Sequence, residues 1–139
     1  MVHQHFDQVR EIRLETDADL ETRVGEILDA ASRRQLWLMF LDLNSRQLPV
    51  LIPADIPPRP GKRELLGFST FLTGVMEATE AATLVFALER PGSDHISVRD
   101  AEWFRFLQLE CSSASIPTRG PILCHDGGVR WVATDDFVT

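Results

Sequence analysis

The stretch LWLMFL at residues 36–41, followed by DLNS at 42–45 and LPVLI at 48–52, decides the fold. An uninterrupted apolar run of this length predicts a strand that is buried on both faces. The polar residues 42–45 predict a turn, and the second apolar run predicts the partner strand of a β-hairpin. Because Pro49 has no amide hydrogen to donate, we expect the second strand at a sheet edge or at a bulge.

Helical and strand patterns alternate after and before this hairpin. Apolar residues recur at helical spacing in three segments, over about residues 17–33, 62–79 and 97–113. Short apolar runs of strand length lie at about residues 82–88, 122–124 and 129–132. The order α-β-β-α-β-α-β-β predicts an α/β fold in which helices flank a mixed β-sheet.

Two of the expected helices begin with a capping signal. Thr16 precedes Asp19 by three residues, and Ser97 precedes Asp100 by the same spacing. In a capping box the hydroxyl and the carboxylate each accept the backbone N–H of the other residue. This spacing gives Asp100 a structural role at the start of the third helix.

Length and composition predict one globular domain over residues 1–139, with residues 1–9 expected to be flexible. The start of the chain lacks the pattern of a signal peptide and no apolar run is long enough for a membrane span, so we expect a cytoplasmic protein. Cys111 and Cys124 are then expected to be thiols. A net charge of −7, without an evident basic cluster, disfavours nucleic-acid binding.

Three segments resemble the motifs of RadC-type JAB (MPN-like) domains. LMFLD at 38–42 resembles the first strand of that family, and ERPGSD at 89–94 with SVRD at 97–100 resembles its metal-binding loop. ILCHDGG at 122–128 resembles its glycine-containing turn. The resemblance covers about residues 10–135 and implies a JAB-like, or cytidine-deaminase-like, fold.

The same resemblance implies that the metal ligands are missing. In the family, two histidines and an aspartate hold zinc, and a glutamate acts as the base. Alignment from Asp100 backwards places Ala87 and Glu89 at the two histidine positions, and the base falls near Ala54 or Asp55. Since alanine cannot bind zinc, the resemblance implies a non-catalytic module with no metal and no cofactor.

An enzymatic alternative uses the loop itself. Glu89, His95 and Asp100 lie close together in the sequence and could form an altered, metal-dependent hydrolase site. This alternative requires the three side chains to converge in one pocket. Solvated loop charges are the simpler interpretation of the same residues.

The third helix carries more apolar surface than one sheet face requires. Trp103, Phe106 and Leu109 lie beside the stripe that is expected to face the sheet. One interpretation is a surface for a homodimer or another protein partner, because aromatic residues are enriched at such surfaces. The other is a helix wedged between the sheet and a neighbouring helix.

Overall fold

The structure is a computed structural model that describes residues 12–28, 31 and 33–137, with the side chains of residues 63–66 excepted. The expectation of flexibility for residues 1–9 therefore lies outside the described part of the chain. The element order within that part confirms the predicted α/β class and the predicted succession of helices and strands. The elements are α2 (Asp17–Ile27), β1 (Gln35–Leu41), β2 (Gln47–Asp55), α3 (Lys62–Thr79), β3 (Thr83–Glu89), α4 (Val98–Ser113), β4 (Thr118–His125), β5 (Gly128–Trp131) and the 3-10 turn η1 (Thr134–Asp136).

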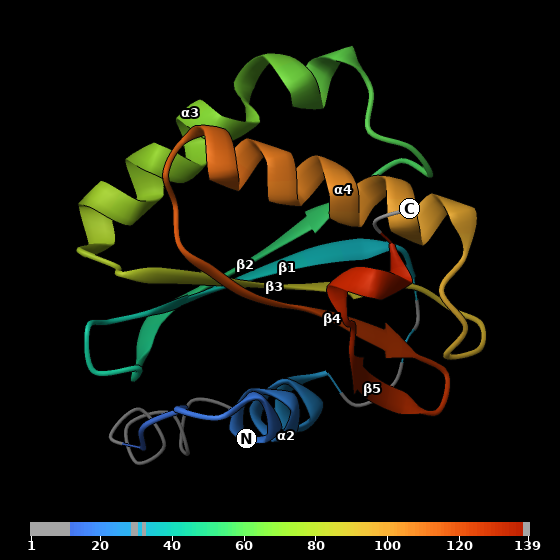
Figure 1. Cartoon of the computed structure of the whole chain (residues 1–139), viewed down its shortest axis with the longest axis horizontal. Helices are drawn as coiled ribbons and strands as arrows, with labels where there is room; N and C mark the ends of the chain where they lie inside the picture. The colour runs from blue at the N-terminus through green and yellow to red at the C-terminus, as the bar shows by residue number, and fades with distance from the viewer. Residues whose placement is uncertain (1–11, 29–30, 32, 138–139) are drawn as a thin grey trace.

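The described strands form a mixed five-stranded sheet in the order β2-β1-β3-β4-β5. β1 is antiparallel to both β2 and β3, and β4 is antiparallel to β5. β3 and β4 are parallel, so α4 is the crossover between them. Helices α3 and α4 cover one face of the sheet and α2 lies on the other, as Figure 1 shows.

The hairpin occupies the position that its sequence predicts. Every residue of β1 except Trp37 is buried, as expected for an interior strand. β2 lies at the sheet edge, and Pro49 falls where the register is irregular: between two paired positions β1 advances two residues and β2 advances four. A missing N–H donor is tolerated at such a site. Leu14 donates its N–H to Ser45 O in the β1–β2 turn at 2.8 Å, and this bond joins the segment before α2 to the hairpin.

Both predicted capping boxes are confirmed, and one helix boundary is corrected. At the start of α2, the N–H of Thr16 donates to Asp19 Oδ2 and the N–H of Asp19 donates to Thr16 Oγ1, each at 3.0 Å. That helix ends at Ile27, whereas the sequence predicted an end near residue 33. Leu28 adopts extended backbone angles, with φ −110° and ψ 91°, and this ends the helix. Part of the segment expected to be helical, residues 29, 30 and 32, lies outside the described residues.

The core divides according to the two faces of the sheet, because successive strand residues point to opposite sides. On the α3 and α4 side the strands contribute Leu36, Leu38, Phe40, Leu84 and Phe86. On the α2 side they contribute Met39, Leu41, Val85, Ala87, Ile122 and Cys124. A smaller cluster at the start of α4 contains Leu88, Phe104, Leu123, Val132 and Phe137.

Helix α4 is wedged between the sheet and α3. The interpretation of Trp103 and Phe106 as part of an exposed partner surface is therefore wrong. Trp103 is 0% exposed and Phe106 is 8% exposed. Trp103 donates its indole N–H to Pro57 O at 3.0 Å and meets Phe106 edge to face, with ring centroids 5.7 Å apart. Phe68 of α3 also packs against Phe106, with ring centroids 5.5 Å apart. Leu109 alone is exposed, at 66%.

Candidate functional site

The loop between β3 and α4, residues 90–97, lies at the C-terminal ends of the parallel strands β3 and β4. Open α/β sheets place ligand sites at this end of their parallel strands. The turn after β4 lies beside the loop, because Asp126 donates its N–H to Gly92 O at 2.9 Å. Arg130 of β5 donates to Asp94 O at 2.9 Å, so β5 also holds the loop. This is the segment that the sequence marked as the candidate site.

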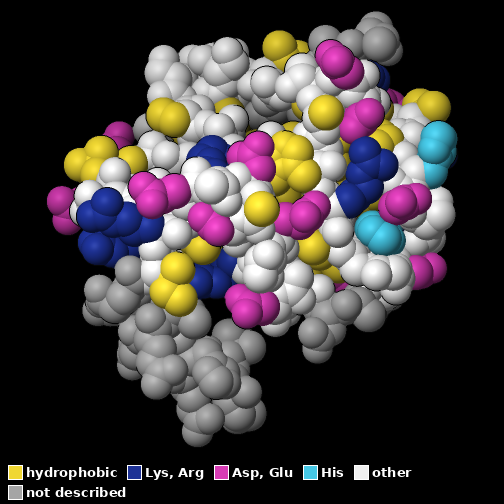
Figure 2. Space-filling view, turned by 60° about the horizontal axis from the view of Figure 1, so that its bottom comes forward, with side chains coloured by type: hydrophobic (Ala, Val, Ile, Leu, Met, Phe, Trp, Pro, Cys, Tyr) yellow, Lys and Arg dark blue, Asp and Glu magenta, His cyan; other side chains and the backbone are white. Residues whose placement is uncertain are grey.

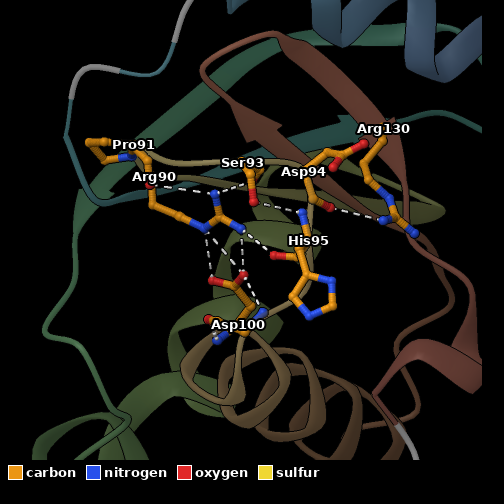
Figure 3. A network of polar contacts seen from close by, with 8 residues as sticks. Arg90, Pro91, Ser93, Asp94, His95, Asp100 and Arg130 are labelled. Atoms are coloured by element: carbon orange, nitrogen blue, oxygen red, sulfur yellow. Dashed lines mark hydrogen bonds and ion pairs between the residues drawn. The ribbon is translucent and has the colours of Figure 1, made fainter.

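Arg90 organises the loop from within (Figure 3). Its Nε lies 3.2 Å from both carboxylate oxygens of Asp100, and its Nη2 lies 2.8 Å from Oδ2. The remaining donors reach backbone carbonyls, with Nη1 2.5 Å from Ser93 O and Nη2 2.8 Å from His95 O. The residue is only 6% exposed, and a planar guanidinium can satisfy several acceptors at once. One buried side chain therefore ties Ser93, His95 and the start of α4 to the end of β3.

Asp100 is a fully buried carboxylate with all of its charge compensated locally. Ser97 donates its N–H to Oδ2 at 3.0 Å, and the N–H of Asp100 bonds to Ser97 Oγ at 3.1 Å, which confirms its predicted capping role. Burial by itself raises the pKa of Asp100, but the hydrogen bonds from Arg90 and Ser97 and the charge of Arg90 lower it below its ordinary value. The carboxylate is therefore ionised and paired at neutral pH.

Ala87 and Glu89 point to the opposite side of the sheet from Asp100. Ala87 packs in the core on the α2 side, and Glu89, two residues further along the strand, shares its face. Glu89 is 5% exposed and accepts the indole N–H of Trp37 at 2.9 Å. Asp100 instead lies in the first turn of α4, which covers the other face. Glu89 and Asp100 therefore make their polar contacts on opposite sides of the sheet, Glu89 with Trp37 and Asp100 with Arg90.

The position expected near the base is placed on the same row as Glu89. Asp55, Gln35 and Glu89 are direct cross-strand neighbours on β2, β1 and β3. Gln35 donates its amide to Asp55 Oδ1 at 3.1 Å. Ala54, the other residue expected near the base, carries no group that can transfer a proton. The amide of Gln35 on β1 therefore binds the carboxylate of Asp55 on the edge strand β2, and this row does not include Asp100.

His95 contributes its backbone and not its ring to this network. Its N–H bonds to Ser93 Oγ at 3.2 Å and its carbonyl accepts from Arg90, whereas its imidazole is exposed and points away from the guanidinium (Figure 3). The structure thus does not bring Glu89, His95 and Asp100 together. Among the residues that the structure describes, no group of three His, Cys, Asp or Glu side chains is placed to hold a metal ion.

The two cysteines are buried, unpaired thiols, as expected. Burial, reinforced by the charge of Glu110, raises the pKa of Cys111 to about 12. Burial, reinforced by the charge of Glu89, raises the pKa of Cys124 to about 11. Because the thiolate is the nucleophilic form, neither side chain suits nucleophilic catalysis at neutral pH.

Arg90 is not among the residues that the sequence predicts for the site, although it makes the most hydrogen bonds there. It lies directly after a strand that reads as fully buried, ten residues before a capping aspartate. A charged residue at the end of a buried strand commonly has a partner, and this signal could have suggested the pair. The partner itself becomes evident only when the loop is folded.

Comparison with protein families and with curated proteins yields no match: no protein-family model matches the sequence, and no curated protein matches it either. The resemblance to RadC-type JAB domains therefore stays a prediction from the motifs quoted above and from their order along the chain. Within the described residues, no helix has both the length and the apolar character to cross a membrane.

Proposed function

We propose that this chain is a non-catalytic, JAB-like cytoplasmic module that acts by binding another protein or a second copy of itself. The observation that carries the proposal is the ion pair between Arg90 and Asp100. The resemblance makes Asp100 the aspartate ligand of the metal, and here a guanidinium already occupies both of its oxygens. The module then keeps the architecture of the family without its chemistry.

Displacing Arg90 with a metal ion is energetically unfavourable. The ion would have to break a pair whose members are both buried, which would leave the guanidinium buried and unpaired. The remaining ligand positions do not compensate for this loss. Ala87 offers no donor atom, and Glu89 faces the other side of the sheet. A hydrolytic centre of the family type therefore has no place to assemble in this loop.

Metal analysis combined with a hydrolase assay tests the proposal. The purified chain is loaded with excess zinc, desalted, and analysed for bound metal, and it is then incubated with peptide and isopeptide substrates. We expect substoichiometric zinc and no turnover above that of an Asp100→Asn variant. Stoichiometric, tightly held zinc together with chelator-sensitive turnover would show that the chain is an enzyme.

The protein-binding half of the proposal is tested through Leu109, the exposed residue of the expected interface. Light scattering gives the oligomeric state of the wild-type chain and of the Leu109→Lys variant. If α4 mediates self-association, the variant is a monomer at concentrations where the wild type is a dimer. A Leu43→Lys variant is the matched control, because Leu43 is 90% exposed in the β1–β2 turn. A wild-type monomer, or equal dimerisation of both variants, rules out self-association through Leu109.

A further inference from the structure

Helix α3 lies outside α4 on its side of the sheet (Figure 1), and part of its outer face is small and apolar. The exposed residues Gly67, Phe71, Gly74 and Ala78 follow one another at intervals of four, three and four. At 3.6 residues per turn, positions with this spacing share one face of a helix. Phe71 is 47% exposed, so a large aromatic side chain stands between two glycines at the surface.

The two glycines are not required by the fold of the single chain. A Cβ atom at Gly67 or at Gly74 would meet no atom within 4 Å, and neither residue has a positive φ. Glycine in the interior of a helix is less stable than alanine, because it loses more backbone freedom when the chain folds. Its advantage on a helix surface is that the backbone of another element can approach closely.

A second copy of α3 matches this face. Two α3 helices that pack antiparallel about a two-fold axis midway between Phe71 and Gly74 bring residue 71 of each copy opposite residue 74 of the other. The same operation brings Gly67 opposite Ala78. Each phenylalanine then packs on a glycine, and small residues meet at either end of the contact. The face is therefore complementary to itself, as the interface of a two-fold dimer must be.

The charges at the two ends of α3 favour the same antiparallel arrangement. Lys62 is exposed at the start of the helix, and Glu77 and Glu80 are exposed at its end. None of the ion pairs between described residues includes these three side chains. The last turn has no basic residue, so Glu77 opposes the helix dipole within one copy. In an antiparallel pair the acidic end of each helix lies beside the positive end of the other, which is electrostatically favourable.

The α2 side of the molecule has a different character. Figure 2 shows carboxylates and cations dispersed among the apolar side chains on that side. The carboxylates of Glu21 and Glu26 on α2 interact within the chain, with the N–H of Trp131 and with Arg23. At α3, by contrast, a small apolar face and charges that are not paired within the described chain occur together.

From this arrangement we propose that the chain forms a homodimer through the outer faces of two antiparallel α3 helices. The inference rests on the proposed binding function and names the surface and its occupant, a second copy of the chain. A helix of 18 residues is about 27 Å long and about 10 Å wide, so the contact covers roughly 300 Å² of each copy. This area is below that of a standard interface, and we therefore expect a weak dimer with a dissociation constant on the order of 100 µM.

Sedimentation equilibrium over a range of concentrations measures the association. We expect the average mass of the wild type to rise from that of a monomer at about 10 µM towards that of a dimer at about 1 mM. Phe71→Lys places a charge against the glycine of the other copy and should raise the dissociation constant at least about tenfold. Leu109→Lys makes the same chemical change on α4 and should leave it unchanged. A wild-type monomer at about 1 mM, equal effects of the two variants, or loss of the dimer only in Leu109→Lys overturns the proposal.

Gly74→Leu separates association from folding. The new side chain has free space in the single chain, and leucine favours a helix more than glycine does. We therefore expect a urea midpoint at or above that of the wild type at concentrations where both are monomers. The same side chain blocks the phenylalanine of the other copy and should raise the dissociation constant at least about tenfold. Gln108→Leu adds leucine at an exposed position of α4 and should not change association, whereas wild-type dimerisation of Gly74→Leu overturns the proposal.

Crosslinking tests the antiparallel arrangement with Phe71 and Gly74 left in place. Gly67→Cys and Ala78→Cys chains are mixed at about 1 mM and oxidised with diamide, and mass spectrometry distinguishes the mixed disulfide from the two symmetric ones. We expect the mixed disulfide to predominate, because residues 67 and 78 of different copies lie opposite each other. Equal crosslinking of a Gln108→Cys chain, or a Gly67→Cys self-crosslink as abundant as the mixed one, overturns the proposal.

Failure of this inference is distinguishable from failure of the proposed function. Zinc binding and turnover are measured separately, so an active metalloenzyme would refute the proposed function. A metal-free, inactive chain that stays monomeric, or that dimerises through Leu109, would refute only the dimer of α3 helices.

Discussion

Replacement of Arg90 by methionine removes the charge at the centre of the loop and keeps much of the side-chain volume. Asp100 would then be a fully buried carboxylate without its cation, and the carbonyls of Ser93 and His95 would lose their donors. Breaking a buried pair by removing one partner typically costs about 3–5 kcal/mol. We therefore expect Arg90→Met to lower the free energy of unfolding by about 4 kcal/mol, a large part of the stability of an ordinary domain.

The double variant separates pairing from loss of packing. Asp100→Asn keeps the size of the capping residue but removes its charge, so the guanidinium is left unpaired and we expect a loss of about 3 kcal/mol. The Arg90→Met, Asp100→Asn double variant contains neither charge, so no buried charge lacks its partner. Its free energy of unfolding should fall by about 2 kcal/mol less than the sum of the two single decreases.

Urea unfolding followed by circular dichroism measures these differences. Arg130→Met is the matched control, because its pair with Asp136 is nearly as short, at 2.9 Å against 2.8 Å, but about a third of each side chain is exposed. We expect that variant to lose at most about 1 kcal/mol. The reasoning is refuted if Arg90→Met is as stable as the control, or if the two single losses simply add.

Three further predictions follow from burial. Trp103→Ala should lower the free energy of unfolding by about 3–5 kcal/mol, because a fully buried ring and its hydrogen bond are removed. Leu109→Ala removes an exposed side chain and should change the free energy of unfolding by less than about 0.5 kcal/mol. Equal urea midpoints for the two variants would contradict the burial of Trp103. Cys111 and Cys124 should react with iodoacetamide at pH 8 far more slowly in the native chain than in denaturant, and equal rates by mass spectrometry would show that the thiols are accessible. Since the pKa of Asp100 is lower in the folded chain, its contribution to stability is present above the ordinary aspartate pKa of about 3.9 and is lost as the pH falls further. Acid titration should therefore destabilise the wild type more steeply than Asp100→Asn, and parallel pH profiles would contradict the assignment.

Local signals along the chain were sufficient for the architecture. The apolar run at 36–41 and Pro49 predicted an interior strand and its edge partner, because burial on both faces and a missing N–H donor each restrict where a strand can lie. The spacing of Ser97 and Asp100 predicted the capping box, which involves only residues of one turn. These interactions join near neighbours, so their geometry follows from the backbone of the element itself.

The sequence by itself determined the order of the elements, the interior strand and the local role of Asp100. Only the tertiary structure decided which side chains meet across the fold. Helical spacing placed Trp103 beside the sheet-facing stripe, but its burial depends on Pro57, 46 residues earlier, and on the position of α3. Likewise, Arg90 and Glu89 are adjacent in sequence, yet they face opposite sides of the sheet and only Arg90 reaches Asp100. The physical reason is that periodicity specifies the direction of a side chain within its element, whereas packing between elements determines what occupies the space in that direction.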